Sequence, residues 1–373
     1  MRTFFSYTRI NSYKTGALIM KLEKWEWIKN ISRKQMVLMC VLLVGVYFLA
    51  SPPTRLSDGR QQQDATNLVG SMGETYSDDA EVQASYTVYL LHDSGYLVKT
   101  EFFANQGADR SSVQSVFSAL QVGTQHLQPS VTGLIPNGAV IRDYELNDDT
   151  LTLNLSESFL YYRTSIEQNL LTSLVWSLTE LDQINRVQFE IEGETVNNFN
   201  TALDVSRGLT RAMGINIEVA APRVVDAQMM LLYFFTDDSD ELLVPVTRLV
   251  APAVEPFEYA VASLVRGARG ANYVSVFNHR ATLLEQPKLE NGIMTLNFCA
   301  ELFFDLEQTQ VSSLAIKQLV MTMTEFAEVY EVSVVVEGSS RVFDDAGNPI
   351  TVPVSRNVVR GNQSRLRGFV HEY

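Results

Sequence analysis

The chain has few of the residues from which metal centres and disulfide frameworks are built. Its 373 residues include two cysteines and four histidines. Cys40 lies in an apolar run and Cys299 in a strand-like segment, so no disulfide framework or cysteine metal site is expected, and Cys299 is predicted to be a small buried hydrophobe. The histidines each lack a second ligand two to four residues away, so no metal or cofactor site is predicted. They are His92, His126, His279 and His371.

Sequence patterns of catalysis are also missing. There is no Gly-x-Ser-x-Gly elbow and no glycine-rich phosphate loop, and the basic stretch 266–270 is too short for a nucleic-acid patch. Glu180 and Glu325 occupy matching places near helix ends, but acid–base partners must lie within about 10 Å of each other and these belong to separate domains. We expect each to bond a neighbouring loop, and Asn154 and Asn297 to fix strand exits through side-chain-to-backbone bonds. No catalytic residue is predicted, and the chain is not expected to be an enzyme.

Positive charge is scarce outside the N-terminal segment. The net charge is −14, yet residues 1–35 carry eight basic and two acidic side chains, or +6. The remaining 21 basic and 41 acidic residues give −20. Nucleic-acid binding requires Lys and Arg to neutralise phosphates, so it is disfavoured for this acidic body.

Only one long apolar run occurs, Met36 to Ala50. It is short for a bilayer span, for which about 17 residues suffice when the flanks snorkel. A cleaved signal peptide is the competing interpretation, but Ala50-Ser51 before two prolines is a poor cleavage site. Lipidation of Cys40 is disfavoured because this cysteine lies near the start of the run. We therefore predict an uncleaved transmembrane anchor at residues 36–51.

Charge around this anchor predicts its orientation. Arg33-Lys34 precede it, so the positive-inside rule leaves residues 1–35 as a short cytoplasmic leader and places residues 52–373 outside the cell membrane. Met20 offers an alternative start within the leader. Residues 52–84 are polar and proline-containing, which predicts a flexible linker.

The body of the chain repeats itself. Matching segments recur at offsets of 143 to 145 residues, which indicates tandem duplication of one domain rather than a solenoid of short repeats. The matching pairs are 88–91 with 232–235, 152–154 with 295–297, 174–175 with 319–320, 179–181 with 324–326, and 192–193 with 337–338.

Periodicity predicts the element order β-β-α-β-β-α-β in each copy. In the first copy the expected strands are 86–91, 96–104, 140–146, 150–155 and 186–192, with a helix capped by Asp109 and ended by Gly123 and a second helix at 165–181. In the second copy they are 229–235, 242–249, 281–286, 293–298 and 333–337, with helices at 256–265 and 311–326. An apolar helix stripe needs a sheet face, so we expect two tandem two-layer α+β domains, 85–212 and 226–360, and a tail at 361–373. The segments 203–207 and 350–356 should return along the sheet edges.

These motifs together resemble the tandem GerMN-domain family of sporulation and spore germination proteins. The resemblance rests on the opening Val-Tyr-Leu or Leu-Tyr-Phe strand, Ile135-Pro136-x-Gly138, Leu153-Asn154-Leu155, Thr179-Glu180-Leu181 and the final Glu-Gly. It implies a fold akin to ring-building motifs, an extracytoplasmic location and no known catalysis. The second copy departs from the pattern, with 277–280 in place of the Ile-Pro-x-Gly turn and Cys299-Ala300 in place of Ser156-Glu157. The family's lipoprotein cysteine is not matched.

Three functions remain open from the sequence, the least favoured of which is hydrolysis of the cell wall. The first is a non-enzymatic envelope protein that binds sporulation-complex proteins or self-associates. The second is a module that holds peptidoglycan or a small germinant in a groove between the domains. Four aromatic pairs would each place one ring inward and one outward on a strand, and the outer rings could form an interface. The pairs are Phe102-Phe103, Tyr161-Tyr162, Phe234-Phe235 and Phe303-Phe304.

Overall fold

The computed structural model describes most of the chain after residue 82. The described ranges are 83–105, 111–124, 127–252, 255–269, 272–305, 307, 309–350 and 353–359, and all belong to one unit, residues 78–373. The predicted leader, anchor and tail lie outside the described residues, as does most of the predicted linker. Across the described ranges, no helix has both the length and the apolar character needed to cross a bilayer.

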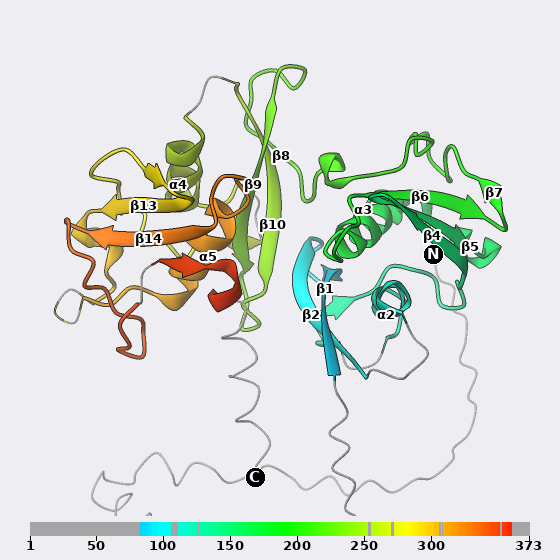
Figure 1. Cartoon of the computed structure of the whole chain (residues 1–373), viewed down its shortest axis with the longest axis horizontal. Helices are drawn as coiled ribbons and strands as arrows, with labels where there is room; N and C mark the ends of the chain where they lie inside the picture. The colour runs from blue at the N-terminus through cyan, green and yellow to red at the C-terminus, as the bar shows by residue number, and fades with distance from the viewer. Residues whose placement is uncertain are drawn as a thin grey trace, which may run out of the picture. The chain divides into compact units, whose positions relative to one another are not determined.

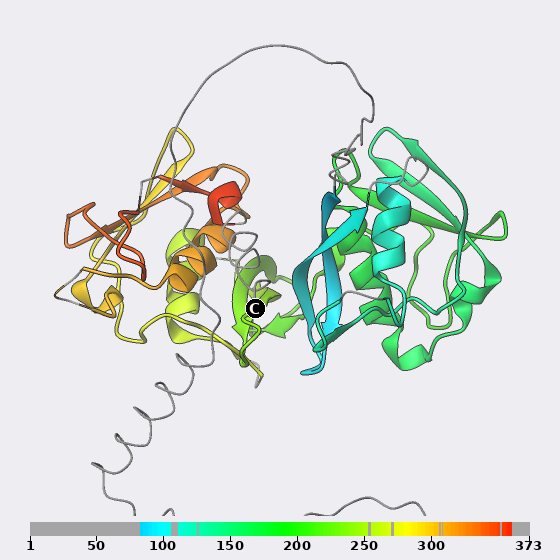
Figure 2. The same ribbon diagram turned by 90° about the horizontal axis from the view of Figure 1, so that it is seen from below.

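The first copy contains the predicted order of main elements, joined by short additions. Its elements are β1 (Gln83–His92), β2 (Leu97–Asn105), α2 (Ser112–Ala119), β3 (Val131–Thr132), β4 (Ile141–Asn147), β5 (Thr150–Leu155), η2 (Glu157–Leu160), η3 (Thr164–Ile166), α3 (Glu167–Leu178), β6 (Arg186–Ile191), β7 (Glu194–Thr195) and η4 (Arg211–Met213). Helix α2 packs along the β1–β2 hairpin (Figure 2). The α+β class is confirmed.

The second copy repeats that order. Its elements are β8 (Glu218–Val219), β9 (Gln228–Thr236), β10 (Leu243–Val250), α4 (Pro256–Arg266), β11 (Tyr273–Val274), β12 (Lys288–Glu290), β13 (Ile293–Phe298), η5 (Ala300–Leu302), α5 (Ser313–Met323), β14 (Glu331–Val336) and β15 (Val354–Ser355). The tail strand β15 pairs with β14, so the segment 350–356 returns along a sheet as predicted. In the first copy the bridging residue is Leu209, which pairs with Val187 of β6 and lies just past the predicted segment 203–207.

The strands of each copy are divided between two sheets, which differs from the two layers predicted. Four-stranded sheets β4-β5-β6-β7 and β12-β13-β14-β15 belong to one copy each (Figure 1). The opening hairpins of both copies form one larger sheet of order β11-β9-β10-β2-β1-β3, with β8 beside β10. Helices α3 and α5 each connect two parallel strands and contact both their own small sheet and the shared one, so they are covered on more than one face.

The seam of the shared sheet, between β2 and β10, has little backbone pairing. Only Leu243 and Lys99 are registered across it. Asn216, which has a left-handed backbone with φ of 45°, supplies the missing bonds. Its Nδ2 donates to the carbonyl oxygens of Leu97 and Pro245, each at 2.7 Å, and its Oδ1 accepts from the Leu97 N–H at 3.0 Å. One amide side chain therefore bonds both edges of the seam.

Small polar residues let α3 and α5 lie close to the shared sheet. Ser177 of α3 accepts from the Tyr89 N–H at 2.9 Å, and Thr322 of α5 accepts from the Tyr233 N–H at 3.1 Å. Ser173 donates to the Tyr89 carbonyl at 2.5 Å. These hydroxyls are buried, and burial of a polar group is tolerated when it is hydrogen-bonded. The duplicated contact fixes the same helix-to-strand position in each copy.

Two local predictions are wrong for physical reasons. The N-cap of α2 is Ser111 rather than Asp109, because Ser111 and Gln114 form a reciprocal capping box. The strand expected at 281–286 is absent from those residues, and β12 pairs with β13 instead. The predicted turn there is confirmed: Asn291 and Gly292 have φ of 52° and 80°, which suits a two-residue hairpin turn whose partner strand must directly precede it.

Candidate functional site

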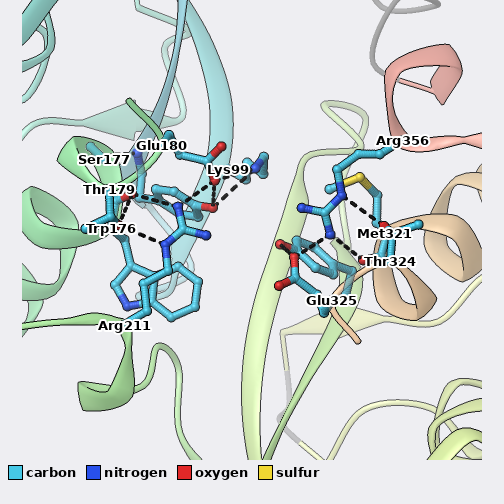
Figure 3. A network of polar contacts seen from close by, with 12 residues as sticks. Lys99, Trp176, Ser177, Thr179, Glu180, Arg211, Met321, Thr324, Glu325 and Arg356 are labelled. Carbon is cyan, nitrogen blue, oxygen red and sulfur yellow. Dashed lines mark hydrogen bonds and ion pairs between the residues drawn. The ribbon is translucent and has the colours of Figure 1, made fainter. Parts of the chain in front are cut away.

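A carboxylate just beyond the end of α3 collects two cations and a phenol (Figure 3). Oε1 of Glu180 lies 2.8 Å from Nζ of Lys99 and 2.9 Å from Nη2 of Arg211, and it accepts a hydrogen bond of 2.7 Å from the Tyr89 hydroxyl. The side chains of Glu180 and Lys99 are only 10% and 7% exposed. We call these four residues the Glu180 cluster. It ties helix, hairpin and tail of the first copy together.

The second copy carries the same arrangement with one cation fewer. Oε1 of Glu325 lies 2.5 Å from Nη2 of Arg356 and accepts a hydrogen bond of 2.8 Å from the Tyr233 hydroxyl. We call these three residues the Glu325 cluster. Tyr89 pairs with Lys99 in the first hairpin and Tyr233 pairs with Pro245 in the second, so Pro245 occupies the place of Lys99. Lys99 faces Leu243 across the seam. The copies therefore differ in charge at their junction.

Each arginine also closes the end of its helix. Arg211 donates from Nε to Thr179 Oγ1 at 2.8 Å and from Nη2 to a carbonyl of α3 at 3.2 Å. Arg356 donates likewise to Thr324 Oγ1 and to a carbonyl of α5, both at 2.9 Å. Helix carbonyls at a C-terminus lack partners and carry partial negative charge, so a cation there is favourable. The clusters thus cap α3 and α5.

Burial and neighbouring charges shift the pKa values of Glu180, Tyr89 and Tyr233. Burial opposes the charge of Glu180, but Lys99 and Arg211 outweigh it and hold the pKa of Glu180 well below its usual value. Burial, followed by the charge of the neighbouring glutamate, raises the pKa of Tyr89 and of Tyr233 well above 10. Proton transfer at neutral pH requires a pKa near neutrality. The arrangement therefore suits a structural role better than acid–base chemistry.

The clusters also influence one another. The charge of Glu180 contributes to the raised pKa of Tyr233 and of Arg356, although burial is the largest influence on both, raising the former and lowering the latter. Figure 3 shows the two clusters on either side of the shared sheet's strands. The copies are thereby coupled electrostatically at their junction.

The glutamates and asparagines predicted to form local hydrogen bonds do form them. Glu180 and Glu325 bond the returning tail segments through Arg211 and Arg356, as expected of helix-end residues. Asn154 Oδ1 accepts from the Gly193 N–H at 2.9 Å, and Asn297 Oδ1 accepts from the Gly338 N–H at 3.1 Å. The side-chain-to-backbone bonds are confirmed, but they hold the Glu-Gly turn after the neighbouring strand.

Sequence reasoning missed Lys99, Arg211 and Arg356. A signal for the two arginines was present, since Arg211 and Arg356 are separated by 145 residues, the same offset as Glu180 and Glu325. No such signal existed for Lys99, because Pro245, which occupies its place in the second copy, is uncharged.

The cysteine and histidine predictions have mixed outcomes. Cys299 is buried as expected, and its Sγ accepts from the Thr282 N–H at 3.1 Å, as Ser156 Oγ accepts from the Val140 N–H at 3.0 Å. This cysteine therefore replaces a serine in the same bonding role. His279 is exposed, and His126 and His371 lie outside the described residues. His92 is 5% exposed, and its Nε2 lies 3.0 Å from Oδ2 of Asp238, so a carboxylate distant in sequence lies beside it.

The outward aromatic rings occupy equivalent places in the two copies. Tyr161 follows η2 and is 71% exposed, while Phe304 follows η5 and is 59% exposed. Their neighbours Tyr162 and Phe303 pack against the core, as Phe102 does beside the exposed Phe103, so the expectation of one ring inward and one outward holds for three pairs.

The expectation is wrong for the fourth pair. Phe234 and Phe235 are both buried because both faces of β9 are covered. Helices α4 and α5 pack on this strand, and the ring of Phe234 lies 5.5 Å from the Tyr273 ring.

A cavity of about 480 Å3 lies where residues of the two copies meet. Tyr96 and Asn169 of the first copy line it, together with Glu218, Arg269 and Tyr273 of the second. The rings of Tyr96 and Tyr273 meet edge to face with centroids 4.7 Å apart. The cavity is polar and aromatic, which are the properties of a site for a small polar ligand.

Lys317 of α5 is a further buried charge that the sequence did not single out. It is 8% exposed. Burial lowers its pKa to about 8, and the charges of Glu101 and Glu241 oppose this shift. Desolvation therefore costs more at this site than the nearby carboxylates return.

Two α+β copies that share a sheet and carry a duplicated helix-end cluster define a tandem two-domain protein. The family model described as Germane, sporulation and spore germination, matches residues 87–197 and 231–342. The chain belongs to the Germane family, and the predicted resemblance to tandem GerMN-domain proteins is confirmed.

Individual relatives agree with that assignment. The chain is 29% identical over 328 residues to the spore germination protein GerM of Bacillus subtilis (strain 168), which spans 82% of this chain and 88% of that protein. The structure of the tandem GerMN domains of the sporulation protein GerM from Bacillus subtilis matches with a TM-score of 0.67 and 24% identity, over 74% of this chain and 97% of that one. The two proteins share the tandem fold.

Proposed function

We propose that this protein is a membrane-anchored, extracytoplasmic assembly factor of sporulation or spore germination that works through protein–protein contacts and without catalysis. The observation that carries the proposal is the exposure of Tyr161 and Phe304 at equivalent positions of the two copies. Exposed aromatic rings are enriched at protein interfaces, where they bury large area at low entropic cost. A ring that recurs on both copies offers two docking points with the same local geometry.

Three further features support the proposal. The ionisable groups of the two clusters are engaged with one another, which fits a scaffold. The apolar run 36–51 with its basic flank supports an anchor with the domains outside. The shared sheet ends in the edge strands β3 and β11, and an edge strand is a template for pairing with another chain, as in the lateral packing of ring-building motifs.

The test replaces the exposed rings one at a time and together. Tyr161→Ala and Phe304→Ala should each weaken complementation of a deletion strain in spore formation or germination, and the double variant should weaken it most. Tyr330→Ala is the matched control: it is 70% exposed, but its counterpart in the first copy is Asn185, so the ring is not repeated. Equal protein amounts must be verified by immunoblot. Full activity of the double variant would refute the docking role.

A photo-crosslinking amino acid at position 161 addresses the partner directly. In sporulating cells it should give a discrete crosslinked product with an envelope protein or a second copy of the chain, and the same substitution at Tyr330 should not. Protease added to intact protoplasts should remove the region after residue 52. A protected C-terminal region would rule out the extracytoplasmic location.

A second candidate function is binding of peptidoglycan or a small germinant. The cavity between the copies favours it, because Tyr96 can stack on a sugar face while Asn169 and Arg269 offer polar contacts. Titration with purified muropeptides should then give saturable binding that Asn169→Ala and Arg269→Ala weaken about tenfold. Binding unchanged in both variants, or no binding at all, would leave the assembly role alone.

A further inference from the structure

His92 and two aspartates of the other copy form a compact group of possible metal ligands. His92 closes β1 of the first copy, whereas Asp238 and Asp240 lie in the turn between β9 and β10 of the second. One ligand atom from each lies within 4.8 Å of the others. The sequence separation of almost 150 residues explains why no metal-ligand spacing was visible in the chain.

The imidazole nitrogen that faces the aspartates lacks a satisfactory partner. Nε2 of His92 lies 3.0 Å from Oδ2 of Asp238, but neither this oxygen nor any other acceptor among the described residues is in hydrogen-bond geometry with it. His92 is 5% exposed, so water is not a ready substitute. A buried nitrogen in this state destabilises the fold. A bound cation would satisfy both the nitrogen and the carboxylates.

The surrounding bonds hold the three groups in place. Nδ1 of His92 lies 2.7 Å from Ser94 Oγ and 3.2 Å from the backbone nitrogen of Ser94. In the tautomer in which Nδ1 carries the proton and donates it to Oγ, Nε2 keeps its lone pair for a metal. Oδ1 of Asp238 accepts from Thr236 Oγ1 at 2.8 Å and from the Asp240 N–H at 3.0 Å, which leaves Oδ2 on the side of the histidine. Oδ2 of Asp240 accepts from the Ser130 hydroxyl.

We infer that His92, Asp238 and Asp240 form a site for a divalent transition-metal ion that links the two copies. One imidazole with two carboxylates favours zinc or manganese over calcium, which takes oxygen ligands throughout. Three protein ligands leave room for water to complete the coordination. The ion would neutralise part of the acidic 237–241 turn and fasten it to β1.

The experiment is calorimetric titration of the purified full chain with zinc, manganese and calcium chlorides. Zinc should bind at one ion per chain and raise the melting temperature. Asp238→Asn and Asp240→Asn should weaken zinc binding at least tenfold. Asp237→Asn is the matched control, because it removes the same charge from the same turn without removing a ligand, and it should bind zinc as the unaltered chain does.

A second measurement identifies the ligand nitrogen. With 15N-labelled histidine, zinc should shift the Nε2 resonance that is absent from a His92→Gln variant. Circular dichroism establishes that each variant is folded. The inference is overturned by the absence of saturable zinc binding, by calcium binding as tightly as zinc, or by Asp237→Asn weakening zinc as much as Asp240→Asn. It is also overturned if the His92 nitrogen does not respond.

Discussion

Replacing Glu180 by glutamine should destabilise the first copy severely. The change leaves Lys99, whose side chain is 7% exposed, and Arg211, at 31%, without their shared carboxylate. Removing one partner from a buried ion pair costs about 3–5 kcal/mol, because the remaining charge is desolvated without compensation. Glutamine keeps the shape and can still accept from Tyr89, so the loss should come from the charge alone.

The assay is urea unfolding followed by the fluorescence of Trp176. This residue lies inside the affected region, since the Arg211 guanidinium stands 4.9 Å from its ring centre. Trp25 and Trp27 are changed to phenylalanine in every variant, so that the signal comes from one tryptophan. The free energy of unfolding of Glu180→Gln should fall by the stated amount, with an unchanged denaturant slope.

Two comparisons decide whether burial is the cause. Glu192→Gln breaks an ion pair with Arg142 whose side chains are 47% and 51% exposed, and it should cost far less than Glu180→Gln. Glu325→Gln leaves one cation at 21% exposure, so its cost should be intermediate, about 1–3 kcal/mol. A Glu180→Gln loss no larger than that of Glu192→Gln would refute the reasoning.

Replacement of Lys99 supplies a rescue. Lys99→Leu removes the charge and keeps an apolar side chain at this buried position. In the Glu180→Gln background it should recover at least half of the lost stability, because the buried charge that has lost this carboxylate is gone. In the unaltered chain the same substitution should instead destabilise, since Glu180 then loses one of the two cations beside it. Equal effects in both backgrounds would show that the two residues are not coupled.

Three other outcomes follow from the structure. The pKa of Glu180 is lowered in the folded state, so its contribution is complete above the unfolded value of about 4.3 and is lost as pH falls below it; the acid limb of a stability–pH profile should be shallower in Glu180→Gln. Lys317→Met should raise the free energy of unfolding at pH 7 by roughly 1–3 kcal/mol, because the folded state lowers the lysine pKa to about 8. In the unaltered chain, the free energy of unfolding should rise with pH between 8 and about 10.4. An unchanged urea midpoint in Lys317→Met would contradict this. Gly133→Ala should cost more than 3 kcal/mol, since a Cβ there would overlap the backbone carbonyl of Leu120. At Gly95 nothing lies within 4 Å, so Gly95→Ala should cost about 1 kcal/mol, from the positive φ alone. Thermal denaturation of the two variants compares these costs directly.

Periodicity predicted the core elements well because each is amphipathic and local. The strands Thr150–Leu155 and Ile293–Phe298 match their predicted bounds, since alternation and flanking turns define both ends. Within 281–286 only Leu283 bridges to β13, at Phe298, because the tight turn at 291–292 selects the residues directly before it, β12, as the regular partner. Local pattern alone does not choose between two neighbouring candidates.

Long-range polar contacts were the least predictable part. Glu180 was recognised as a duplicated position, but its partners depend on how the tail returns over α3. The sharing of one sheet by two copies left no trace in either copy's periodicity, because each hairpin looks complete by itself. The same is true of His92 and Asp238, which only tertiary structure brings together.

Asn216 gives the chain a joint that can be weakened independently of its domains. Its amide takes the place of backbone hydrogen bonds across the seam. The substitution Asn216→Leu would therefore remove three hydrogen bonds from the seam and none from either hydrophobic core. The freedom between the copies therefore depends in part on a residue outside both hairpins, beside the contacts of Ser130 with Asp240 and of His92 with Asp238.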